Sequence, residues 1–211
     1  MTKTIRWDLL RLSPVRPVLA AAALTILTAG VPAPGRAQLH EFGIGAGIAA
    51  AVSEINTRQG PGPHLLGYAG VHVNATLQFR GELAFVQFNG QPYSGIAGPS
   101  GESRPDLRVA SVGGTLVYTP RGTGNGAYGF LGAGAYSLTA DGVENRDGMV
   151  AGASVGVGTN LNVGGRTLFA QTRLEVPFST FGSSSEFSPN VYLPFTLGLR
   201  IPCCGDPAPG T

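Results

Sequence analysis

Hydrophobic and polar residues alternate over 190–201, a segment with the sequence NVYLPFTLGLRI. Six apolar residues occupy every second position, and the intervening positions are polar, small or proline. A two-residue period places the two sets on opposite faces of a β-strand. The apolar row is close in length to the roughly 9–11 residues that a tilted strand needs to cross a bilayer. We therefore expect this segment to be the closing strand of a small transmembrane β-barrel.

The chain before it repeats the same alternation, and no amphipathic helix of useful length appears. The further predicted strands are about 40–52, 64–73, 77–88, 107–118, 127–138, 149–161 and 166–176. The register of 127–138 is left open, because both of its faces are apolar or glycine, and a bulge at one of its glycines is an alternative. The predicted fold is all-β: an eight-stranded antiparallel up-and-down transmembrane β-barrel over 38–201.

The connections between the predicted strands differ in length. The longer ones are 53–63, 89–106, 139–148 and 177–189, the short ones are 74–76 and 162–165, and 119–126 is intermediate. Short periplasmic turns and longer extracellular loops are typical of outer-membrane barrels. With the N-terminus in the periplasm, the four longer connections all lie outside the cell. We expect any surface binding to use them.

The first 37 residues have the pattern of a secretory signal peptide. Basic residues precede a thirteen-residue apolar run over 18–30, and Gly35 and Ala37 stand at the −3 and −1 positions of a cut before Gln38. The run is shorter than the roughly 20 residues of a membrane-spanning helix. We expect export to the bacterial outer membrane, with 202–211 as a flexible, proline-rich periplasmic tail.

Charge is scarce and decides which face of the strands meets lipid. Charged residues make up 12% of the chain, against about 25% in ordinary soluble domains. The formal net charge of +2 comes from the leader, because the chain after residue 37 has nine Arg and eleven acids. Nothing here indicates nucleic-acid binding. The polar, glycine-rich face is too poor in charge for a soluble exterior, so we expect it to line a narrow lumen.

Four charged residues are predicted to lie inside that lumen. Arg80 and Glu82 share one face of the third predicted strand, and Arg173 and Glu175 share one face of the seventh. An outward Arg near the membrane midplane would cost about 2–4 kcal/mol. In an eight-stranded barrel these two strands are diametrically opposite, so we expect one structural ion-pair network that plugs the lumen. Separate pairs within each strand are the alternative.

Aromatic residues gather near the ends of the predicted strands. They are Phe42, Phe79, Tyr118 and Tyr128 at the periplasmic ends and Phe85 and Tyr136 at the outer ends. This arrangement resembles the two aromatic girdles of membrane proteins. The ordinary preference of strands for aromatic residues is an equal alternative.

The segments LQFRGELAFVQF, YGFLGAGAY and LPFTLGLRI, together with the leader, resemble the eight-stranded outer-membrane barrels of the OmpA, OmpX and opacity-protein type. The resemblance covers about 38–201. It implies insertion by the barrel-assembly machinery and contact with outer-membrane lipid and lipopolysaccharide. It also implies a structural, adhesive or small-ligand-binding role, without choosing among these. We expect a monomer.

Candidate chemistry is sparse. His40, His64 and His72 lack metal-like spacing with each other or with cysteine, so no metal or cofactor is expected. No nucleophile–base pair is evident, with His64 expected near the outer rim and Ser53 across the first loop, so we expect no enzyme. The alternatives are a lipid A-modifying barrel enzyme and a soluble periplasmic barrel that holds an apolar ligand.

The state of the two cysteines is left open by the sequence. For Cys203 and Cys204, the possibilities are a vicinal disulfide, free thiols and bonds to another chain.

Overall fold

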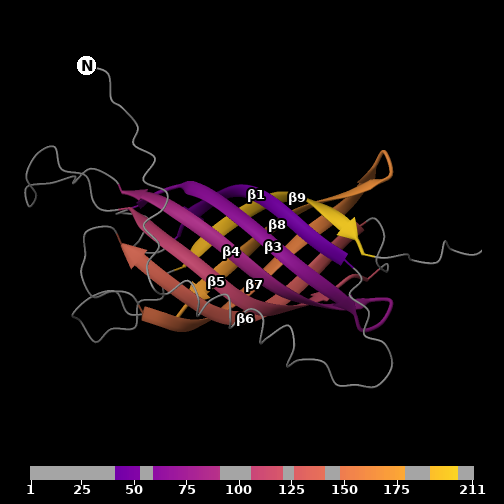
Figure 1. Cartoon of the computed structure of the whole chain (residues 1–211), viewed down its shortest axis with the longest axis horizontal. Coiled ribbons are helices and arrows are strands. Elements are labelled where there is room, and N and C mark those ends of the chain that lie inside the picture. The colour runs from indigo at the N-terminus through magenta and orange to yellow at the C-terminus, as the bar shows by residue number, and fades with distance from the viewer. Residues whose placement is uncertain are drawn as a thin grey trace, which may run out of the picture. The chain divides into compact units, whose positions relative to one another are not determined.

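The chain folds into one closed antiparallel barrel (Figure 1). The computed structural model describes residues 41–52, 59–90, 106–120, 126–140, 148–178 and 191–203. The strands are β1 (Glu41–Ala51), β2 (Gln59–Gly60), β3 (Gly62–His72), β4 (Leu77–Gly90), β5 (Leu107–Tyr118), β6 (Gly126–Ala140), β7 (Gly148–Val163), β8 (Arg166–Pro177) and β9 (Tyr192–Pro202). No helix in these ranges is long and apolar enough to cross a membrane.

Closure comes from the pairing of the first and last strands. β1 pairs with β3 on one side and with β9 on the other, and β4–β5 pairing joins the two halves of the sheet. The eight long strands confirm the predicted up-and-down barrel. The two-residue β2 was not predicted: it pairs with Asn89 and Gly90 at the end of β4.

The two ends of the barrel differ. At one end, here called the turn end, β1 begins, β9 ends, and hairpins join β3 to β4 and β7 to β8 (Figure 1). The Asn74 side chain accepts hydrogen bonds from the Thr76 and Leu77 amides, which builds the short turn expected there. Gly164 and Gly165 have φ of 57° and 77°, as a two-residue hairpin with two left-handed positions requires. The opposite end is here called the loop end.

The register of β6, which the sequence left open, follows from its ladders. Pairing with β5 runs without interruption from Leu107↔Ala140 to Tyr118↔Gly129, so β6 contains no bulge along this edge. Tyr128, Phe130 and Tyr136 are buried in the lumen, whereas Leu131 faces outward and is exposed. The bulky aromatic residues of this strand therefore lie inside the barrel.

Apolar side chains cover the outside of the barrel. In β9 the alternation is as predicted: Leu193, Phe195, Leu197 and Ile201 are exposed, with Leu197 at 56%. The same outer belt continues around the sheet through Ile44, Ile48, Leu65, Leu83, Leu116, Leu131, Val155 and Val157. Arg80 and Arg173 are 2% and 4% exposed. The exposed apolar rows therefore face away from the centre of the barrel, whereas Arg80 and Arg173 face toward it.

The lumen is filled by side chains, as a barrel of eight strands requires. Toward the loop end the filling is apolar and includes Ala49, Val86, Phe88, Val109, Leu138 and Tyr192. The rings of Phe88 and Tyr192 meet edge to face at 5.6 Å between centroids. The charged residues lie nearer the middle and the turn end.

Candidate functional site

Six charged side chains are buried in the lumen among the strands that the structure describes. They are Glu41, Arg80, Glu82, Arg173, Glu175 and Arg200. Three carboxylates face three guanidinium groups, so the set is neutral when all are ionised. Their contacts divide them into two groups.

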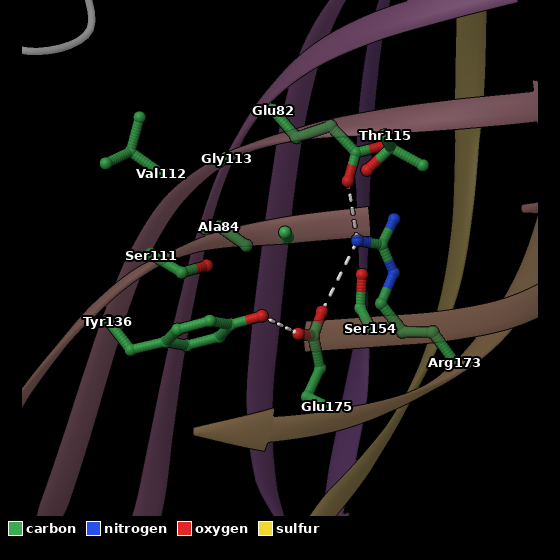
Figure 2. Close-up of a pocket in the computed structure, with 12 residues that line it drawn as sticks. Glu82, Ala84, Ser111, Val112, Gly113, Thr115, Tyr136, Ser154, Arg173 and Glu175 are labelled. Atoms are coloured by element: carbon green, nitrogen blue, oxygen red, sulfur yellow. Dashed lines mark hydrogen bonds and ion pairs between the residues drawn. The ribbon is translucent and has the colours of Figure 1, made fainter. Parts of the chain in front are cut away.

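The first group crosses the barrel and is here called the central cluster. Arg173 on β8 lies 2.6 Å from a carboxylate oxygen of Glu82 on β4 and 3.3 Å from Glu175. The Tyr136 hydroxyl donates a hydrogen bond to the other oxygen of Glu175 (Figure 2). One guanidinium therefore joins two carboxylates, and the cluster has a formal charge of −1.

The second group, here called the turn-end cluster, gathers around Glu41. Arg200 donates a hydrogen bond to one oxygen of Glu41, and Arg80 lies 3.7 Å from the other. Arg80 also donates through Nε to Gln78 at 2.8 Å, and its guanidinium lies 4.3 Å from the centroid of the Tyr68 ring. This cluster has a formal charge of +1. Arg80 and Glu82 are two residues apart on β4, so the two oppositely charged clusters are neighbours along the lumen.

The predicted network of four residues is thus divided. Glu82, Arg173 and Glu175 come together, through both a cross-barrel pair and a pair within β8. Arg80 instead pairs with Glu41, a residue that was not included in the predicted site. Glu41 and Arg200 could have been found from the sequence: each lies on the polar face of its strand, and closure makes the first and last strands neighbours.

A small cavity of about 20 Å³ adjoins the central cluster, lined in part by Ser111, Thr115 and Ser154 (Figure 2). A volume of roughly 10–15 Å³ holds one water molecule. One carboxylate oxygen of Glu82 and two guanidinium nitrogens of Arg173 are buried without a protein hydrogen-bond partner. The cavity beside the central cluster therefore has room for about one water molecule.

The histidine of the enzyme alternative lies inside the barrel and not at its rim. His64 is 1% exposed, and its Nδ1 lies 2.9 Å from the Thr196 hydroxyl oxygen. Thr196 is itself fully buried, so this pair lies in the lumen, away from the lipid-facing surface. Ser53 and the four longer connections over most of their length lie outside the described residues, as do 1–40 and Cys204.

Several solved outer-membrane barrels are similar in shape to this chain. OprG of Pseudomonas aeruginosa matches with a TM-score of 0.50 at 13% identity, over 78% of this chain and 97% of that structure. The chain has the fold of the eight-stranded outer-membrane β-barrels. Neisserial surface protein A matches at 19% identity and a TM-score of 0.48, covering 77% of this chain and 96% of that one. The Yersinia pestis protein Ail matches at 15% identity and a TM-score of 0.44, covering 78% of this chain and 100% of that structure. No family model and no curated protein matches the sequence.

Aromatic rings in this outer-membrane barrel lie close to glycines of the inner wall. Tyr68 is the register partner of Gly43, Tyr128 of Gly158, and Phe169 of Gly198. A Cβ at each of these glycines would lie 2.0–2.4 Å from the ring. The glycines therefore provide the space that the rings fill, which is the pairing called aromatic rescue.

This packing corrects the predicted aromatic girdles at two positions. Tyr128 and Tyr136 are 2% and 3% exposed and belong to the lumen. Phe42, Phe79, Phe85 and Tyr118 face outward and are exposed, as expected. The two tyrosines point inward because glycines on β7 give their rings room: a Cβ on Gly152 would lie 2.4 Å from Tyr136.

Adding a methyl group beneath one of these rings is expected to destabilise the barrel. The Gly43→Ala change places a Cβ 2.0 Å from the Tyr68 ring, and overpacking of this kind costs about 1–3 kcal/mol. The control is Gly67→Ala on the neighbouring strand, where no atom lies within 4 Å. Urea titrations that follow the folded band on unheated gels should show a lower midpoint for the first variant only. Equal midpoints for the two variants would contradict the packing role of Gly43.

Proposed function

We propose that this chain is a bacterial outer-membrane protein whose barrel is a closed membrane anchor, with a structural or surface-binding role rather than an enzymatic one. The observation that carries the proposal is the inverted polarity of the barrel. Leu197 and its neighbours are exposed on the outside, while Arg173 and Arg80 are buried inside. Exposed apolar rows of this extent are stable in lipid and not in water.

Three features support a closed lumen. Apolar side chains fill the loop end, the central cluster spans the barrel from β4 to β8, and the turn-end cluster ties β1 to β4 and β9. Eight strands leave an interior about wide enough for side chains alone. We therefore expect no stable conductance and no bound cofactor.

Binding at the cell surface would involve the connections at the loop end. These connections join β1 to β2, β4 to β5, β6 to β7 and β8 to β9, and a closed barrel leaves them as the part of the molecule open to partners outside the cell. Phe178, at the start of one of them, is exposed. We further propose that the barrel is monomeric, is inserted by the barrel-assembly machinery, and contacts phospholipid and lipopolysaccharide.

Cell fractionation and gel electrophoresis test the proposal. The full chain expressed in a Gram-negative host should be recovered in the outer-membrane fraction and should migrate differently with and without heating, because a folded barrel resists detergent. Planar bilayers containing the purified protein should show no regular conductance steps. Recovery in the soluble periplasmic extract would overturn the membrane assignment, and steady single-channel currents would overturn the closed lumen.

A further inference from the structure

An apolar groove of about 710 Å³ lies on the outer face of the barrel, across the seam where the first and last described strands meet. Its floor includes the small residues Ala46 on β1 and Ala170 on β8. Its rim includes Ile44, Leu168 and Leu197, all large and exposed. Ala46 and Ala170 are both register partners of Leu197. A small residue therefore lies on each side of Leu197, and each leaves a depression in a surface that would otherwise be evenly packed against lipid.

A cation stands at the turn end of this groove. Arg166 is exposed at the start of β8, two residues before Leu168 and therefore on the same outer face. Its register partner Val163 is exposed as well, at 59%. No described acidic residue pairs with Arg166, whereas the lumen arginines all have carboxylate partners. Successive outward residues on a strand are about 6–7 Å apart, so the guanidinium is within reach of the groove.

We propose that this groove holds a glycerophospholipid of the periplasmic leaflet, with one acyl chain over Ala170, beside Leu197, and the phosphodiester on Arg166. A guanidinium matches a phosphate by paired hydrogen bonds and charge. A cation without an acidic partner among the described residues, beside an apolar depression, provides the two parts that a phospholipid needs, in the order in which a lipid presents them at the membrane boundary. The proposal rests on the outer-membrane assignment, because the turn end faces the periplasm only in that case.

Two substitutions separate the two parts of the site. Arg166→Gln removes the charge and leaves the groove. Ala170→Phe fills the floor and leaves the charge. Ala153→Phe adds the same bulk to the outer face of β7, away from the groove, and serves as the matched control. All three are first checked for the heat-dependent gel shift, so that only folded barrels are compared.

Native mass spectrometry of the full chain in detergent, titrated with phosphatidylglycerol or with the phosphate-free diacylglycerol, tests the proposal. Arg166→Gln should weaken phosphatidylglycerol binding about fivefold or more and leave diacylglycerol binding unchanged. Ala170→Phe should weaken both, and Ala153→Phe neither. Unchanged phosphatidylglycerol binding in Arg166→Gln or Ala170→Phe would overturn the site, as would a protein dimer that Ala170→Phe abolishes. These results would leave the outer-membrane assignment intact, because fractionation and the gel shift test it separately.

Discussion

Replacing Arg173 with methionine is expected to lower the free energy of unfolding by about 3–5 kcal/mol, because it leaves two buried carboxylates without their shared cation. Glu82 and Glu175 are 8% and 3% exposed, and Arg173 is within 2.6 and 3.3 Å of them. Methionine keeps most of the apolar stem of arginine, so the loss reports on charge more than on packing. The unfolding midpoint in urea, followed by far-ultraviolet circular dichroism in lipid vesicles, measures the change.

The companion variant removes the charge on both sides of the interaction. In Arg173→Met combined with Glu82→Gln and Glu175→Gln, no ion is left in the central cluster, and replacement of a whole buried ion group is often close to neutral. Most of the lost stability should therefore return. Circular dichroism is preferred to tryptophan fluorescence, because the single tryptophan, Trp7, lies in the predicted signal peptide. A triple variant as unstable as Arg173→Met would show that the cluster contributes packing and not charge compensation.

The strands and their inward faces were readable from the sequence because alternation is a local property. The polar set of 190–201 contains Arg200, and that of 77–88 contains Arg80 and Glu82. An arginine facing lipid is costly, so the position of these residues in the alternation was enough to place their side chains in the lumen. Pairing and closure then followed from the even number of strands and the short turns, such as the Gly164–Gly165 hairpin.

The partners of the ions were not readable in the same way. Whether Arg80 meets Glu82 or Glu41 depends on how far the strands are staggered around the closed barrel, and stagger is a property of the whole sheet. Which face of β6 points into the lumen could also be decided only from the neighbouring strands. Its sequence YGFLGAGAY is apolar on both faces, and the Tyr128 ring points inward because Gly158 lies opposite it on β7. A cross-strand search for aromatic and glycine partners would have indicated this register.

Leu131→Arg is expected to lower the free energy of unfolding by about 2–4 kcal/mol if the outer face of the barrel lies in lipid. Leu131 is 65% exposed near the middle of β6, flanked by Leu116 and Val155 on the adjoining strands. A charged side chain there would have to be buried in hydrocarbon, because no water is near the midplane. Unfolding in urea from lipid vesicles, compared with the unchanged chain, gives the measurement.

Val163→Arg provides the comparison that decides between lipid and water. Val163 is 59% exposed on the same outer face but lies at the turn end of β7, where an arginine reaches the membrane surface and costs about 0–1 kcal/mol. In a membrane the two substitutions therefore differ by their depth, although both replace an exposed apolar residue with the same cation. In a soluble barrel, exposure alone would set the cost, and both would be mild. Equal and small effects at Leu131 and Val163 would exclude a membrane location for the apolar belt.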